Sequence, residues 1–534
     1  MDFSCNQKCR ALIKFTLPAL FILMTAACGS STTPAATTTV TGSVVAAPVA
    51  GATVTVKDGN GATVATATTV TDGTYSVSIP DASLAGDLLI ESAGGTYTDE
   101  ATGTAGVAAE TLSAYIAGGT LSAAASKAYI TPSSTIVNKL VAGGKTLTEA
   151  NTAFSTAFGY TPDSTVKPDM ASAAADATQQ SAEKLAGFHE AAFSQLTSDQ
   201  GLAAGKQFEL LNALATDLAD GSLDGMDGST AVTTTSGNPI PADIQSKFET
   251  AMMDWNANAN NTSGVTASDI GNLPFAKTVL TTSYKVEYVA GTMAAMQGKT
   301  MFKIRVSNIS TGAAVTGLTL AVTPTMHMST MSHTAPVDGV TDNGDGTYTC
   351  VIYYLMASGS SMGYWELAVD VGGETATFYP NVGMSMGDTT KVNLKFSSDT
   401  YTSMGSSTVR TYPVFKDSLT LMNGMGTLKL FIAAQQSMTS WPALATGLSL
   451  NSGAFTVNTL VVEASTDNGT TWNAMTEGTA GHFTLSGIAG LASGTQATFL
   501  VRLTINGNVY NNSSTGTAGG TATNYATFSL TPGM

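Results

Sequence analysis

The spacing of apolar residues changes twice along the chain. In the first part apolar residues occupy every second position, as at Val54 and Val56 and again from Tyr75 to Ile79, with Asp-Gly turn signals between the runs. This alternation is typical of strands that bury one face. The segment 40–100 is therefore predicted to form a small β-sandwich.

Between residues 105 and 257 the spacing becomes that of α-helices. Leu185, Phe188, Ala192 and Leu196 follow the i, i+3, i+4 pattern, and the run from Phe208 to Leu218 repeats it. Such spacing places apolar side chains along one face of a helix. We therefore expect an autonomous helical unit over 105–257.

Alternation returns near residue 274 and lasts to the end of the chain. Runs such as Met301–Val306, Leu318–Val322 and Trp365–Val371 are spaced like the strands of an immunoglobulin-like sandwich. One sandwich is expected over 274–397 and a second over 398–534. The predicted fold class is a multidomain α+β protein, mainly β, in which immunoglobulin-like β-sandwiches accompany an inserted α-helical bundle.

The first 27 residues have the pattern of a secretory signal and are excluded from the fold prediction. Basic residues precede an apolar run that is shorter than the ~20 residues needed to span a membrane. The run ends in Thr25-Ala26-Ala27-Cys28. These residues resemble the lipobox of bacterial lipoproteins, which implies that Cys28 is diacylated and becomes the first residue of the mature protein. An ordinary secretory signal with an incidental cysteine is the alternative.

Residues 28–39 are rich in Ser and Thr and are expected to form a tether. Gly29, rather than Asp, follows the cysteine, which resembles outer-membrane sorting of such lipoproteins. The expected location is the cell envelope, with a lipid anchor in the outer membrane. The sequence leaves two alternatives, the periplasmic face and the surface face of that membrane.

Composition and charge exclude some classes of function. The chain has 534 residues, a formal net charge of −16 and four histidines. An acidic surface repels nucleic acid, so no nucleic-acid partner is expected. We find no catalytic motif in the sequence and expect no enzymatic activity. Cys350 is the one cysteine left after the lipidated Cys28, so no intramolecular disulfide is expected, and strand alternation places Cys350 in a buried, inert position.

Methionine and histidine are concentrated around one stretch of the predicted 274–397 sandwich. Thioether and imidazole donors suit copper, and the thioether in particular selects Cu(I). Alternation along the strand puts Met326 and His327 on opposite faces, while Met331 and His333 are expected on the following loop. The alternative is a surface loop of accidental composition, with the other methionines as core fillers. One or two donors from Met356, Met362, Met384 or Met386 would complete the set. The predicted copper ligands are Met326, His327, Met328, Met331, His333, Met362, Met384 and Met386.

Two segments carry family resemblances. The run Leu318-Thr-Leu-Ala-Val-Thr-Pro-Thr-Met-His-Met, with Asn343-Gly-Asp-Gly-Thr-Tyr and Met362-Gly-Tyr-Trp-Glu-Leu, resembles the YtkA-like and, more distantly, the FixH-like domain. That resemblance implies copper handling linked to cytochrome oxidase assembly. The run from Val40 through Thr71-Asp-Gly-Thr-Tyr-Ser-Val resembles the carboxypeptidase regulatory-like (transthyretin-like) module, which implies a spacer or interaction module.

The expected function is that of a membrane-anchored extracytoplasmic lipoprotein that binds or delivers copper through its Met/His-rich sandwich. Its expected partners are the membrane, through lipidated Cys28, and a protein that donates or receives copper. The alternative is a structural or adhesive cell-surface lipoprotein, built of immunoglobulin-like modules, with no metal role.

Overall fold

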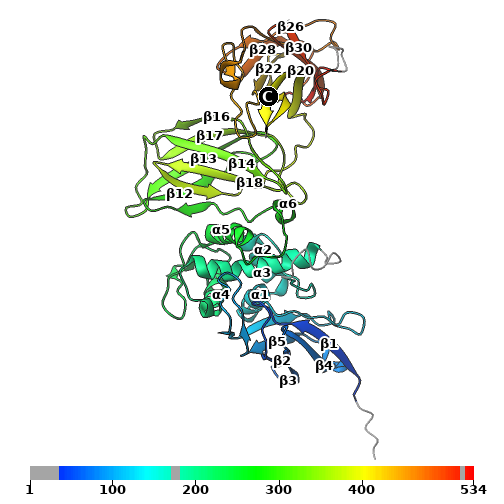
Figure 1. Cartoon of the computed structure of the whole chain (residues 1–534), viewed down its shortest axis with the longest axis vertical. Helices are drawn as coiled ribbons and strands as arrows, with labels where there is room; N and C mark the ends of the chain where they lie inside the picture. Colours follow the sequence, from blue (N-terminus) through cyan, green and yellow to red (C-terminus); the bar gives the residue numbers. More distant parts are fainter. Residues whose placement is uncertain (1–34, 170–180, 404, 518–523, 534) are drawn as a thin grey trace, which may run out of the picture.

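A computed structural model describes residues 35–169, 181–403, 405–517 and 524–533. The predicted signal segment and Cys28 lie outside the described residues. The chain is mainly β, with immunoglobulin-like sandwiches and one helical part, so the predicted fold class is confirmed. Its parts follow one another along the long axis: N-terminal strands, helices, a middle sandwich and a C-terminal sandwich (Figure 1).

Two antiparallel sheets form the N-terminal sandwich. The expected end at residue 100 is too early, because Ile90 pairs with Ala114 and so ties a later strand into the second sheet. One sheet pairs β1 (Thr37–Ser43) with β4 (Thr74–Pro80), and the other has the order β3 (Thr63–Thr68), β2 (Thr53–Asp58), β5 (Leu88–Ala93), β8 (Leu112–Ile116). A short pair, β6 (Thr96–Tyr97) and β7 (Val107–Ala108), lies beside them.

The helices begin at Pro132, not at residue 105 as expected. Thr131 caps the first helix, with its side chain accepting from the N–H of Ser134. The Ser134 hydroxyl donates to the Ser113 carbonyl at 2.8 Å, so this helix starts against the N-terminal sheet. One buried apolar cluster contains residues from Val40 to Leu273 together with Tyr364 and Tyr379, so the helices share a core with the N-terminal sandwich.

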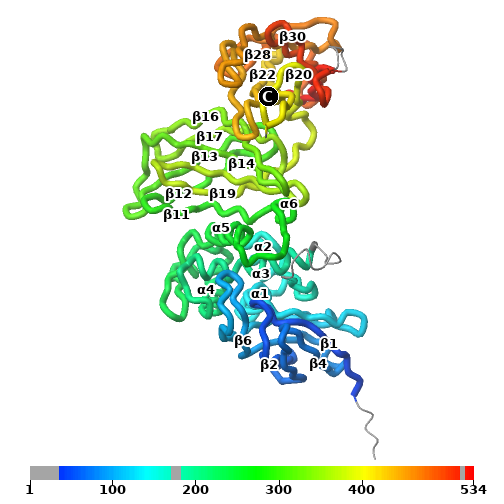
Figure 2. Tube along the Cα trace, viewed as in Figure 1, coloured from blue at the N-terminus to red at the C-terminus, as the bar shows by residue number. Residues whose placement is uncertain are grey.

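The helices are α1 (Pro132–Ala142), α2 (Leu147–Phe158), α3 (Ser181–Asp199), α4 (Gln207–Asp217), α5 (Ile244–Ala257) and α6 (Ala267–Ile270), with the strand pair β9 (Met226–Asp227) and β10 (Thr230–Ala231). Single 3₁₀ turns are η1 (Asp81–Ser83), η2 (Ala204–Lys206), η3 (Leu218–Asp220) and η4 (Asn451–Gly453). α6 lies where the chain passes from the helices to the middle sandwich (Figure 2). The N–H of Ser361 donates to the carbonyl of Ser268 in α6 at 2.8 Å, which ties the two parts together.

The middle sandwich packs a five-stranded sheet against a four-stranded sheet. The first has the order β11 (Thr278–Leu280), β12 (Tyr284–Val289), β13 (Gly298–Asn308), β17 (Thr347–Tyr354), β16 (Val337–Asp342). The second has the order β15 (Ser332–Thr334), β14 (Leu320–His327), β18 (Tyr364–Val371), β19 (Glu374–Phe378). Inward positions alternate along β14 and β18, as the period-two pattern predicts.

The C-terminal sandwich begins before the expected boundary at residue 397, because Lys391 to Lys395 already pair with its second strand. Its first sheet has the order β20 (Lys391–Ser403), β21 (Ser406–Met422), β22 (Met425–Ile432), β28 (His482–Ile488), β27 (Thr476–Glu477). Its second has β26 (Asn473–Ala474), β25 (Leu460–Ser465), β29 (Ala497–Ile505) and β30 (Asn508–Tyr510), with β31 (Ala526–Leu530) also on β29. A short pair joins β23 (Ser449–Leu450) and β24 (Phe455–Thr456).

The middle and C-terminal sandwiches are in direct contact. Tyr353 stacks on Phe431 with ring centroids 4.1 Å apart, and Lys299 forms an ion pair with Asp417. Phe431 belongs to the same buried cluster as the core of the middle sandwich. Apolar burial therefore continues from one sandwich into the next.

Candidate metal centre

The predicted Met/His segment forms a tight hairpin. β14 ends at His327, and the N–H of Met328 donates to the carbonyl of Met331 at 3.0 Å as the chain turns back. The register pairs Met326 with His333 and His327 with Ser332. His333 therefore lies in strand β15, not on a loop as expected. Cross-strand partners point to the same face, so Met326 and His333 share the buried face and His327 lies on the opposite one.

His333 is held in one orientation and is only 8% exposed. Its Nδ1 lies 3.0 Å from the carbonyl oxygen of Thr334. A carbonyl only accepts, so Nδ1 carries the proton and Nε2 of the neutral ring presents a lone pair. That Nε2 lies 3.5 Å from the sulfur of Met356. Two electron-pair donors thus face each other with no proton between them.

The surroundings of His333 keep the imidazole neutral. Burial is the main cause that lowers its pKa below the usual value, and the positive charge of Lys391 lowers it further. The hydrogen bond to Thr334 opposes both effects and is smaller than burial. A neutral imidazole is the form that binds metals.

Met356 was a candidate donor in the sequence, but it was not one of the eight predicted ligands. It follows β17, and the indole N–H of Trp365 donates to its carbonyl at 3.0 Å. Trp365 also packs edge-on against His333, with ring centroids 5.5 Å apart. The indole of Trp365 therefore contacts both members of the pair. Met326, fully buried, pairs in register with both His333 and Trp365.

His327 makes a separate set of contacts on the outer face. Its Nε2 lies 3.0 Å from a carboxylate oxygen of Glu366, and its ring stacks on Tyr364 at 5.0 Å. Gly363 presses against the end of this strand: a Cβ at that position would lie 1.9 Å from the His327 carbonyl oxygen. Its φ of +119° is also one that favours glycine. Met362, half-buried beside it, is held near the hairpin by this contact.

The other predicted ligands do not reach the buried pair. Met328 is half-buried just beyond the strand, and Met331 is 47% exposed at the turn. Met384 and Met386 are 64% and 88% exposed on a different loop. Of the eight predicted residues, the structure brings together Met326 and His333, and adds Met356. Spacing alone did not distinguish Met356 from Met362, because both lie in irregular backbone beyond a strand.

Cysteine and clustered carboxylates add no further candidate ligands among the described residues. Cys350 is buried as expected, and burial raises the pKa of its thiol to about 12, so it stays protonated. Within the described residues no three His, Cys, Asp or Glu side chains come together in a group that would hold a metal ion. None of the helices in those same ranges is long and apolar enough to cross a membrane.

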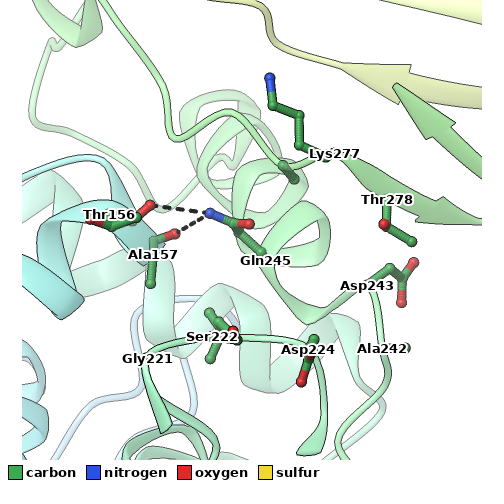
Figure 3. A pocket seen from close by; sticks show the side chains of 12 residues that line it. Thr156, Ala157, Gly221, Ser222, Asp224, Ala242, Asp243, Gln245, Lys277 and Thr278 are labelled. Carbon is green, nitrogen blue, oxygen red and sulfur yellow. Dashed lines mark hydrogen bonds between the residues drawn. The ribbon is translucent and has the colours of Figure 1, made fainter. Parts of the chain in front are cut away.

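A cavity of 280 Å³ lies between the helices and the start of the middle sandwich (Figure 3). The side-chain amide of Gln245 donates to the carbonyl of Ala157 at 3.0 Å across it. Asp243 lies on its rim and accepts from the N–H of Leu280 at 3.1 Å. Lys277 points away from the cavity, with its amine 3.0 Å from the centre of the Phe275 ring. The polar groups here fasten neighbouring segments together and do not converge on a common point.

Comparison with known proteins gives no family for this chain. No family model and no curated protein matches it. Among solved structures, invasin, a bacterial integrin-binding protein, is 11% identical over 46% of this chain and 40% of its own, with a TM-score of 0.15. Domains 5–6 of the S-layer protein SbsC are 12% identical over 48% and 99%, with a TM-score of 0.15. Titin domains Z1Z2 in complex with telethonin are 11% identical over 48% and 96%, with a TM-score of 0.12. These likenesses concern the fold alone.

Proposed function

We propose that this protein is an extracytoplasmic lipoprotein, anchored through Cys28, whose middle sandwich binds copper as Cu(I) through His333, Met356 and Met326. The observation that carries the proposal is the 3.5 Å separation between His333 Nε2 and Met356 Sδ. The copper role agrees with the resemblance of residues 318–371 to the YtkA-like domain. Membrane fractionation of a Cys28→Ala variant tests the anchor.

The separation suits a shared ion. Nitrogen and sulfur donors at about 2.0 and 2.3 Å from one ion lie roughly 3.5 Å apart when the angle between them is tetrahedral. A neutral imidazole and a thioether form no hydrogen bond with each other, since neither carries a proton to donate at the facing atoms. An ion between them would turn two opposed lone pairs into two bonds.

The donor set and its surroundings favour a soft ion of low charge. Imidazole and thioether are soft or intermediate ligands, which Cu(I) accepts and Mg²⁺ or Ca²⁺ does not. Lys391 lies close enough to lower the pKa of His333. Because repulsion grows with the charge of the bound ion, the monovalent ion is disfavoured less than a divalent one. The protein's own residues supply the ligands, keep the imidazole neutral and exclude water from one side.

A second function is favoured by the arrangement of the parts. Four parts follow in line (Figure 1), and Tyr353 and Phe431 pack the last two sandwiches together. A structural or adhesive lipoprotein needs this kind of continuous extension away from its anchor, and it needs no metal. A measurement of Cu(I) binding distinguishes the two proposed functions, since only the first requires it.

The test is anaerobic titration of the purified chain with Cu(I) against a coloured Cu(I) chelator, for wild type and Met356→Leu. Leucine keeps the volume and apolar character of the side chain, so we expect the fold to be retained, with a cost below ~1.5 kcal/mol. We expect the variant to lose one tightly bound equivalent of Cu(I). Met425→Leu, at an exposed position in the C-terminal sandwich, is the control and should lose none. Equal binding by wild type and Met356→Leu would show that the His333 site does not hold copper, and no Cu(I) binding by wild type would leave the structural function as the better account.

A further inference from the structure

A second group of methionines lines a cavity at the junction of the middle and C-terminal sandwiches. The cavity has a volume of 520 Å³. Its methionines come from three separate segments: the loop before β13, the outer face of β13, and the loop that follows β19. They are Met293, Met296, Met301 and Met386, which we call the junction methionines.

Backbone hydrogen bonds hold the two loops side by side. The N–H of Gln297 donates to the carbonyl of Gly383 at 2.9 Å, and the N–H of Gly383 donates to the carbonyl of Ala295 at 2.9 Å. The N–H of Met296 donates to the hydroxyl of Thr300 at 3.1 Å. The junction methionines are therefore brought to one cavity by fixed backbone, although about 90 residues separate the first from the last.

Three of the four side chains are exposed to an extent that packing does not explain, and Met296 is half-buried. Met293 is 70% exposed, Met301 52% and Met386 88%. Leaving apolar area in water forgoes about 25 cal/mol per Å² of stabilisation, and grouped exposed apolar side chains mark binding sites. Seven of the ten large apolar side chains exposed in the described ranges are methionines. The property they share is the thioether sulfur, not apolar bulk alone.

The charged groups that line the cavity are already paired. Lys299 forms an ion pair with Asp417, and Lys416 forms one with Asp388. Asp388 also accepts from the N–H of Thr531 at 2.9 Å. A hard cation such as Ca²⁺ requires several free oxygen ligands, and these carboxylates are engaged. The thioether sulfurs of the junction methionines line the same cavity.

We propose that the junction methionines form a second, solvent-accessible site for a soft monovalent cation, Cu(I), bound by thioethers alone. Thioether selects Cu(I) among the biological metals. This inference takes Met386 out of the single centre that the sequence predicted and assigns it to a different one. It stands on the cavity and its exposed sulfurs, so it does not require the His333 site to exist.

The donors at the junction methionines do not titrate. A thioether carries no proton in the accessible pH range, so binding at the junction methionines should be the same at pH 7 and pH 5. The variants below, and not the pH, identify which of the two sites an equivalent of copper occupies.

The experiment titrates the full chain with Cu(I), anaerobically and against a coloured chelator, at both pH values. The variant Met293→Leu/Met296→Leu/Met301→Leu/Met386→Leu keeps apolar bulk and removes the sulfurs. We expect it to lose one equivalent that wild type retains at pH 5. The matched control, Met331→Leu/Met422→Leu/Met425→Leu, replaces three exposed methionines elsewhere and should lose none.

Each result decides one of the two sites. Loss of the acid-resistant equivalent in the four-leucine variant supports the junction site, whatever Met356→Leu does. Unchanged binding by the four-leucine variant overturns it and leaves this cavity as an apolar surface. If Met356→Leu alone changes nothing, the His333 site fails while the junction site still stands.

Discussion

The two faces of the β14–β15 hairpin carry the same residue types in different environments. On the inner face His333 is 8% exposed and its Nε2 faces the sulfur of Met356 at 3.5 Å. On the outer face His327 is half-buried and its Nε2 faces a carboxylate of Glu366 at 3.0 Å. One imidazole has a soft, uncharged neighbour and the other a charged acceptor. His327 and His333, six positions apart in one motif, therefore have different neighbours on opposite faces of the hairpin. Closeness in sequence does not place them in one site.

The two faces should differ most in the loss of stability when one side chain is removed from each, Trp365 from the inner face and His327 from the outer face. Trp365 is fully buried and contacts both members of the inner pair. Trp365→Ala should lower the free energy of unfolding by roughly 3–5 kcal/mol, the usual cost of deleting a large core side chain. His327→Ala removes a half-exposed hydrogen bond to Glu366 and should cost less than about 1 kcal/mol. Denaturant unfolding followed by circular dichroism gives both values.

Similar costs for the two substitutions would contradict this description of the hairpin. The expected ratio follows from burial and not from any metal. The ratio of the two costs therefore tests the packing of the hairpin and does not depend on copper binding.

A change of pH should have a smaller effect on the free energy of unfolding than these substitutions. The pKa of His333 is lowered in the folded protein, whereas an unfolded histidine titrates near ~6.5. Below that value the unfolded chain binds more protons than the folded one, so stability decreases as the pH falls toward the folded pKa and then levels off. His333→Asn should lack this decrease. The difference in unfolding free energy between wild type and His333→Asn should therefore change in the variant's favour from pH 7 to pH 5, and a constant difference would show that His333 titrates normally.

The fold class could be predicted from the sequence because the spacing of apolar residues is a local property of each strand and helix. Period-two runs such as Trp365–Val371 became strands with alternating burial, and the 3.6-residue period around Phe188 became α3. Boundaries were less accurate. β8 lies beyond the expected end at residue 100 and β20 straddles the expected boundary at residue 397. Strand membership depends on pairing partners distant in sequence, such as Ile90 with Ala114. Residues near a boundary carry no local mark of that pairing.

The candidate site was predicted only in part, for a related reason. Alternation correctly separated Met326 from His327. It did not predict that the chain would reverse within four residues and return His333 to the same inner face, since that depends on the register of Met326 with His333. Met356 came into the pair through the hydrogen bond from Trp365. Met386 was grouped with these residues by composition, yet it lies beside Met293 and Met301 at the junction cavity.

The most direct measurement is site-resolved NMR on the chain labelled with ¹³C at methionine methyl groups and ¹⁵N at histidine rings. Cu(I) is added anaerobically at pH 7. The account predicts that the Nε2 resonance of His333 and the methyl resonances of Met356 and Met326 shift together, while both ring nitrogens of His327 stay unchanged. Shifts at His327 without shifts at His333, or no shift at Met356 after full loading, would contradict it.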